Sequence, residues 1–204
     1  MNLQQYKTLI IVVTSVSALL VASPAIQTLL VYPPPDYFSA IWLLGSEGEA
    51  EGFPFNLKSG TSYNLHLGIE NNLGSCAYYQ VQVKFRNLTQ SAPNDKNLTP
   101  SDLPPLYKLS YFVPIQESLT VPLTFSFNYT SDLNTDNTNT PKVTFYYLLI
   151  NGVPLNMNGF STSWDSERNG FPGNLFFELW IYNTTTGIFQ YHQRYTSLLF
   201  NMTT

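Results

Sequence analysis

The pattern of hydrophobic positions changes character once along this chain. From Thr8 to Val31 the sequence is apolar and uncharged, and at about 1.5 Å per helical residue this length spans the hydrocarbon of a bilayer. Beyond Asp36, hydrophobic and polar residues alternate in short runs separated by Asn, Thr, Ser, Pro and Gly, which is typical of β-strands joined by turns. The pattern predicts one membrane span followed by one β domain.

This change divides the chain into four predicted parts. We expect a cytoplasmic N-terminus over residues 1–7, a transmembrane signal anchor over residues 8–32, a proline-rich linker over residues 33–36 and an extracytoplasmic β domain over residues 37–204. Lys7 precedes the span and the first charges after it are acidic, so the positive-inside rule places the N-terminus in the cytoplasm. A cleaved signal peptide is the alternative, with Ser23-Pro24-Ala25 as its cleavage site. The apolar run is longer than a typical signal core, which favours a single-pass protein of the cell membrane.

Period-two alternation predicts the strands of the β domain. The expected runs are Tyr37–Leu44, Ser62–Ile69, Tyr79–Phe85, Tyr107–Phe112, Ser118–Phe127, Val143–Ile150, Leu175–Tyr182, Phe189–Tyr191 and Tyr195–Met202. In the third run, Gln82 and Lys84 are expected on the outer face. Pro122 cannot donate to a ladder and predicts a sheet edge or a bulge. Val143–Ile150 and Leu175–Tyr182, apolar on both faces, are expected as central strands. Seven to nine strands without an amphipathic helix predict an all-β, immunoglobulin-like two-sheet sandwich.

Composition narrows the function classes. Charged residues make up 11% of the chain and the net charge is −4, and no cluster of Lys and Arg offers the basic face that nucleic acid requires, so we expect no nucleic-acid partner. Cys76 is the single cysteine, which excludes an internal disulfide. We expect it to be a small core residue, with a reactive thiol as the alternative.

Five Asn-x-Thr sequons follow the predicted span, which places them where glycosylation is possible. Their asparagines are Asn87, Asn97, Asn128, Asn183 and Asn201. Because so few charges are available to keep the surface soluble, attached glycans would supply that solubility. The sequence therefore predicts an N-glycosylated surface protein.

Two stretches are candidate binding sites. Glu47, Glu49 and Glu51 share one face if their loop is extended, and could hold Ca²⁺; a solvated acidic loop is the alternative. Trp164 and Arg168 lie together in an aromatic, acidic and basic cluster that could stack on a sugar or hold a partner. The alternative is that Arg168 pairs with a neighbouring acid while Trp164 packs at the rim. We expect no catalytic residue, no cofactor and no resident metal.

Several segments also resemble a known family. They are Glu51–Pro54, Lys58–Gly60, Leu67–Asn72 and Tyr79–Val83, and near the C-terminus Phe177–Asn183, Tyr191–Tyr195 and Leu198–Thr203. In order and spacing these segments are similar to the archaeal domain of unknown function 1616, over most of residues 38–203. The resemblance implies a membrane-anchored protein of the archaeal envelope without an assigned activity. Longer members carry several N-terminal spans where this chain has one.

These observations predict a structural or protein-interaction module rather than an enzyme. The expected partners are the membrane, together with another envelope or membrane protein or a second copy of the chain; an accessory subunit of a membrane complex belongs to the same hypothesis. A surface module that binds glycan or calcium is the alternative. An enzyme would need a cleft with perturbed titratable groups, which the sequence does not indicate.

Overall fold

The computed structural model describes residues 3–30, 37–94, 96–132 and 140–203. The chain divides into two units, Met1–Asp36 and Tyr37–Thr204. The first unit contains one helix, α1 (Leu3–Leu30), which continues past Pro24. Its segment Tyr6–Pro24 is long and apolar enough to cross a membrane. The predicted linker over residues 33–36 lies outside the described residues.

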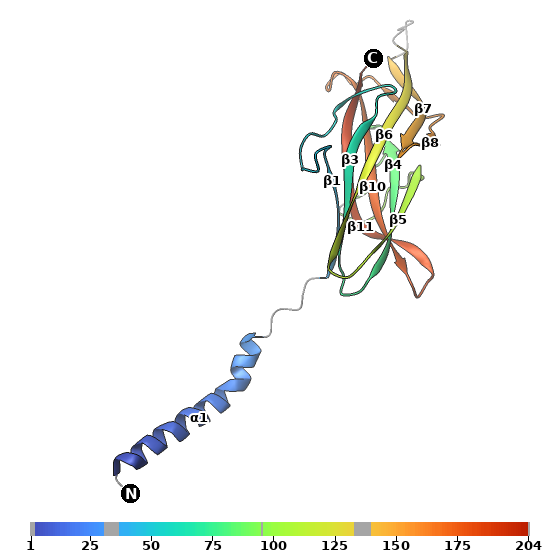
Figure 1. Ribbon diagram of the computed structural model, residues 1–204. Helices are drawn as coiled ribbons and strands as arrows, with labels where there is room; N and C mark the ends of the chain where they lie inside the picture. Colours follow the sequence, from blue (N-terminus) through green and yellow to red (C-terminus); the bar gives the residue numbers. More distant parts are fainter. Residues whose placement is uncertain (1–2, 31–36, 95, 133–139, 204) are drawn as a thin grey trace. The chain divides into compact units, whose positions relative to one another are not determined.

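The second unit is built from two β-sheets (Figure 1). The first sheet has the order β1-β3-β6-β7-β8, with β9 also paired to β7, and the second has the order β2-β11-β10-β4-β5. The strands are β1 (Phe38–Leu44), β2 (Asn56–Lys58), β3 (Tyr63–Asn72), β4 (Ala77–Arg86), β5 (Tyr107–Val113), β6 (Glu117–Asp132), β7 (Lys142–Ile150), β8 (Val153–Asn156), β9 (Ser161–Ser163), β10 (Phe171–Asn183) and β11 (Ile188–Thr203). All pairings are antiparallel except that of β11 with β2.

The facing sides of the two sheets form one aromatic core. Phe85 of β4 lies 5.8 Å from Phe127 of β6 and 4.9 Å from Phe145 of β7, measured between ring centroids. Phe200 of β11 packs 5.2 Å from Phe127. All four side chains are buried. The burial of these large rings, which meet in T-shaped and tilted arrangements, stabilises the packing of the two sheets against each other.

The strand pattern is confirmed for the long strands and incomplete for the short ones. Within the described residues there are eleven strands instead of seven to nine, because β2, β8 and β9, with three or four residues each, were not predicted. Phe189–Tyr191 and Tyr195–Met202 are one strand, β11, interrupted by a bulge opposite Leu179/Trp180. The turn between β7 and β8 is Asn151-Gly152 with both φ angles positive, and Asn-Gly is a strong sequence signal for a hairpin.

Pro122 lies where the sheet is open on one side. It pairs with His66 of β3, whereas β7 pairs with β6 only from Phe125 onward. The edge position expected for this proline is therefore confirmed locally. On the open side there is no neighbouring strand at Pro122, so its missing N–H costs no hydrogen bond of the sheet. Leu175–Tyr182 is also confirmed as part of a central strand, because β10 lies between β11 and β4.

Candidate functional site

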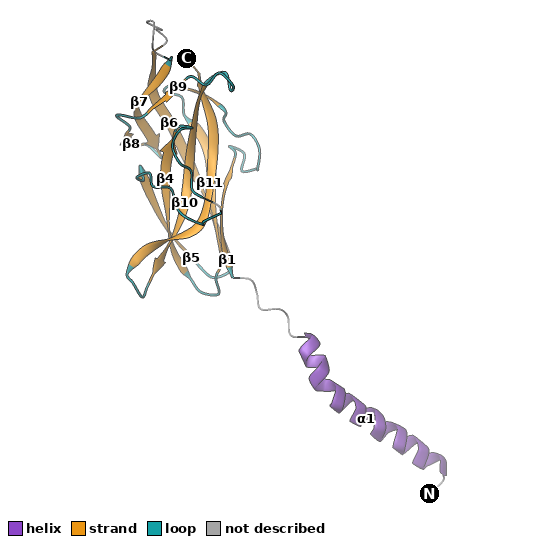
Figure 2. Ribbon diagram, turned by 180° about the vertical axis from the view of Figure 1, so that it is seen from behind, coloured by secondary structure: helices purple, strands orange, loops and turns teal. Residues whose placement is uncertain are grey.

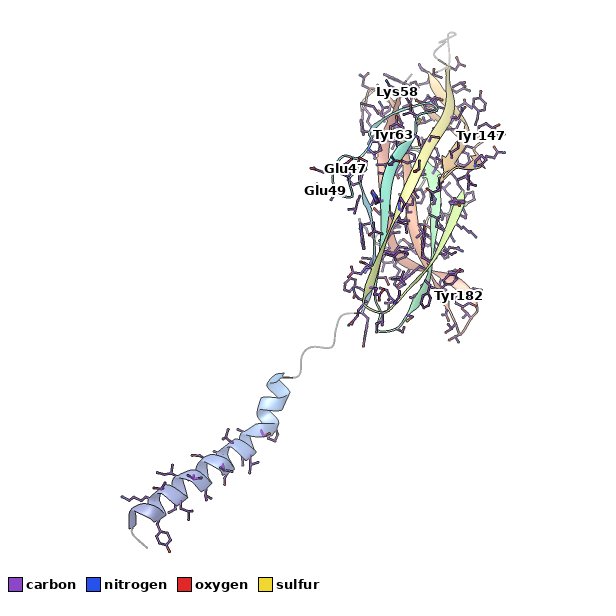
Figure 3. All side chains as sticks on the ribbon, in the orientation of Figure 1. Glu47, Glu49, Lys58, Tyr63, Tyr147 and Tyr182 are labelled. Carbon is purple, nitrogen blue, oxygen red and sulfur yellow. The ribbon has the colours of Figure 1, made fainter. Side chains whose placement is uncertain are left out.

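The acidic loop turns back on itself over Gly45–Glu49 instead of running as one extended segment. The Gly45 N–H donates to the Glu49 carbonyl at 2.7 Å. A Cβ atom at Gly45 would lie 1.9 Å from the Glu51 carbonyl oxygen, so only glycine fits where the chain crosses itself. Glu47 and Glu49 point away from the sheets (Figure 3). Within the described ranges, no three His, Cys, Asp or Glu side chains are grouped to hold a metal ion. The loop therefore presents its carboxylates as an exposed acidic rim.

An apolar pocket follows this loop. It has a volume of about 230 Å³ and is lined by Leu43, Phe53 and the segment Thr196–Leu199. Phe53 and Leu199 remain 40% and 43% exposed, and the neighbouring Phe55 is 55% exposed. The Phe55 carbonyl accepts the Asn201 N–H at 2.7 Å, which fixes this segment against β11. We call Phe53, Phe55 and Leu199, with the acidic loop beside them, the Phe53 surface.

Trp164 and Arg168 are brought together, but the arginine is already engaged within its own turn. Arg168 Nη1 donates to Asp165 Oδ2 at 2.9 Å. The backbone N–H of Arg168 also donates to this carboxylate and, as the largest cause, lowers the pKa of Asp165. Trp164 packs edge-on against Phe171 at 5.1 Å and stays 38% exposed. The arrangement matches the alternative of an internal ion pair and rim packing, and leaves part of Trp164 exposed.

Trp164 also lines a pocket of mixed polar and apolar character. This pocket has a volume of about 240 Å³ and is also lined by Asn87, Thr89, Ser161 and Ser163. Asn87 Nδ2 donates to the Ser161 carbonyl at 3.0 Å, which joins the segment after β4 to β9. An aromatic ring beside hydroxyl and amide groups is an arrangement that can bind a sugar.

The five sequons differ in how far their asparagines are exposed. Asn97 and Asn128 are exposed, whereas Asn87, Asn183 and Asn201 are partly buried. Asn183 Nδ2 donates to Gln190 Oε1 at 3.0 Å. Among the described residues, Asn201 Oδ1 is one of two buried side-chain oxygens without a hydrogen-bond partner. Asn97 and Asn128 are consequently the sequons most accessible in the folded domain.

Sequence reasoning missed a buried ion pair on the outer face of the second sheet. Lys84 Nζ lies 2.8 Å from Glu178 Oε2, and the two side chains are 3% and 0% exposed. The Ser101 N–H donates to Glu178 Oε1 at 2.7 Å, and the Ser101 carbonyl accepts from Lys84 at 2.8 Å. Trp180 Nε1 donates to Glu178 Oε2 at 3.2 Å. Lys84 was correctly placed on the outer face, but residues around Ser101 cover it. The sequence does carry a signal for this buried outer face. Leu175–Tyr182 is apolar on both faces, which indicates that the sheet is covered on both sides at this strand.

A second buried cluster joins the two sheets near the start of β1. Ser39 Oγ is hydrogen-bonded to Tyr79 Oη and lies 3.0 Å from His192 Nε2. The bulge in β11 falls at His192-Gln193, between the residues that pair with Trp180 and Leu179. Burial, with the charge of Arg194 as a smaller cause, lowers the pKa of His192. Burial also raises the pKa of Tyr79. Ser39 is 2% exposed, so this cluster stabilises the contact between β1 and β11 and is closed to a substrate.

We expect His192 to make the stability of the domain depend on pH. Its folded pKa is lowered, so the unfolded chain, with a histidine pKa of about 6.5, takes up a proton first as the pH falls. Stability is therefore lost as the pH drops through 6.5 towards the folded pKa. His192→Gln keeps a polar partner for Ser39 and removes this titration. Thermal melts at pH 8 and pH 5 should show a smaller fall in Tm for the variant than for the wild type; equal falls would contradict the assignment.

The chain matches no protein-family model and no curated protein. The resemblance to the archaeal domain of unknown function 1616 stays a prediction based on the segments described above.

Proposed function

We propose that this protein is a single-pass protein of the cell membrane whose β domain binds another protein outside the cell. In this proposal residues 8–32 anchor the chain, the N-terminus is cytoplasmic, and residues 37–204 form an extracellular, N-glycosylated domain. The apolar helix supports the anchor. Two sheets with one shared core support an immunoglobulin-like sandwich. The role is that of a structural or interaction module of an archaeal envelope, or of an accessory subunit of a membrane complex, without enzymatic activity.

The Phe53 surface is the observation that carries this proposal. It combines an open apolar pocket, two exposed phenylalanine rings and a neighbouring acidic loop. Apolar anchors surrounded by a polar rim are typical of protein–protein interfaces. The three carboxylates favour a partner segment that carries Lys or Arg beside its apolar side chains. Such a partner is another envelope protein or a second copy of this chain.

The test is native mass spectrometry of the full-length protein extracted in mild detergent from its own membranes. We expect a stoichiometric protein partner with the wild type and its loss with Phe53→Ser/Leu199→Ser, because each change removes an exposed apolar anchor. Trp164→Ala serves as a matched control, since it removes an exposed aromatic ring from a different surface. A partner that survives the double substitution, or a wild type with nothing bound, contradicts the proposal.

A glycan-binding module is the second candidate function, and the pocket beside Trp164 favours it. Trp164 is partly exposed and lines this pocket together with Asn87, Thr89 and two serines. In the same experiment this candidate predicts the opposite pattern: Trp164→Ala loses the bound species, the species is a carbohydrate, and the Phe53→Ser/Leu199→Ser variant retains it. A calcium-binding role for Glu47, Glu49 and Glu51 remains part of this alternative as a prediction.

A further inference from the structure

Exposed aromatic and aliphatic side chains gather at one end of the β domain. Phe38 pairs with Asn72 at the end of β3, and Tyr78 pairs with Phe112 at the start of β4. Register therefore places these strand ends together, and the β10–β11 hairpin extends from the same end (Figures 1 and 2). Tyr182 marks this end in Figure 3. We call it the aromatic end; its exposed members are Tyr37, Phe38, Tyr78, Phe112, Ile115, Tyr182 and Ile188.

The rings of the aromatic end are organised rather than scattered. Between ring centroids, Tyr78 lies 5.5 Å from Phe189 and 6.3 Å from Tyr182, and Tyr182 lies 5.3 Å from Phe189. Phe112 and Ile188 nevertheless remain 62% and 57% exposed. Exposed apolar side chains gathered at one end of a domain mark a site of contact with a partner or with a membrane.

Charged residues are sparse at this end. Residues 72–79, 111–116 and 181–191 include no Lys, Arg, Asp or Glu. The exposed Glu117, which pairs with Asn71 at the start of β6, is a charged residue beside them. At the opposite end Asp132 pairs in register with Lys142, and Lys58 is exposed (Figure 3). Tyrosine and uncharged polar residues enter the headgroup region of a bilayer readily, whereas charged side chains resist leaving water.

Chain length keeps the aromatic end within reach of the membrane. Only residues 31–36 separate Leu30, the last residue of α1, from Tyr37. The chain from Leu30 to Tyr37 can therefore reach no more than about 25 Å, the length of a fully extended chain. If α1 spans the bilayer, the aromatic end is the part of the domain that the chain itself holds beside the lipid headgroups.

We propose that the aromatic end rests in the headgroup region of the bilayer that α1 spans, so that the β domain has a fixed orientation on the membrane. This inference rests on the proposed membrane anchor. The Phe53 surface, whose Glu47 and Glu49 lie along the side of the domain (Figure 3), would then stay free for a protein partner. A glycan on Asn183, in the hairpin of the aromatic end, would stand between this end and the bilayer, so we expect this sequon to be bare.

The experiment uses Cys76 as a probe, because it is the one cysteine of the chain and is exposed in the turn between β3 and β4 at the aromatic end. Full-length protein carrying a fluorophore on Cys76 is reconstituted into phosphatidylcholine vesicles that contain a headgroup-nitroxide lipid. The matched control is Cys76→Ser/Lys58→Cys, which places the same label at the opposite end. We expect quenching at position 76 to exceed that at position 58 at least about twofold, since an interfacial segment lies within about 10 Å of the headgroups.

A second variant separates lipid contact from simple tethering. Phe112→Ser/Ile188→Ser removes two exposed anchors, so quenching at Cys76 should fall towards the level of the control while the protein still floats with the vesicles. Equal quenching at positions 76 and 58, unchanged quenching in the variant, or a glycan on Asn183 would overturn the inference and leave the anchor intact. Wild-type protein that does not float with the vesicles would refute the membrane anchor itself, and the inference with it.

Discussion

Lys84→Met should destabilise the β domain by about 3–5 kcal/mol, because it leaves the Glu178 carboxylate buried without its cation. Glu178 is 0% exposed, and its remaining partners are the Ser101 N–H and the Trp180 indole N–H. Neither donor carries a full charge. Denaturant unfolding of both proteins at one pH measures the difference in free energy of unfolding.

The matched control is the double variant Lys84→Met/Glu178→Gln. Glutamine keeps a side-chain oxygen for the Ser101 N–H and removes the negative charge, so we expect it to recover more than half of the lost free energy. A loss below about 1 kcal/mol in Lys84→Met would show that water reaches the pair and that the segment around Ser101 does not cover it.

Phe85→Ala should destabilise the domain by about 3–5 kcal/mol, because it opens a cavity where the two sheets meet. The Phe85 ring contacts Phe127 and Phe145 of the first sheet and Phe200 of its own sheet. These neighbours belong to rigid strands on both sides, so the cavity cannot collapse without moving a sheet. With typical total stabilities of about 5–15 kcal/mol, this single change removes a large share of the stability.

Phe55→Ala is the control for the loss of a phenylalanine ring. Phe55 is 55% exposed, so its removal should change the free energy of unfolding by less than about 0.5 kcal/mol. Both variants are compared by denaturant unfolding at one pH. If Phe85→Ala lost no more than Phe55→Ala, the core described here would not be the element that joins the sheets.

Some positions show why local pattern was insufficient. Cys76 was expected in the core and is exposed, because hydrophobic character alone does not reveal that a residue belongs to a tight turn between two strands. Lys84 was placed on the correct face of β4, but its partner lies 94 residues away at Glu178 and its cover comes from Ser101. Arg168 found its acid within the same turn, which is a local pairing and was foreseen as an alternative.

The same division applies to the proposed surfaces. The acidic loop could be located from its Gly, Pro and Glu content, but not the way Gly45 crosses the backbone at Glu51. The pocket behind Phe53 needs Leu43 from β1 and Leu199 from β11, and these residues become neighbours only when the two sheets assemble. The aromatic end depends on the register of the strands that meet there.

By itself the sequence determined the apolar helix, the β class of the domain and the position of most long strands, because the periodicity of hydrophobic residues reports local backbone geometry. Only the tertiary structure decided which strands pair, which outer face is covered and which apolar side chains remain open. Those features depend on contacts between residues far apart in the chain, and a period-two pattern states which face a side chain takes, not what lies opposite that face.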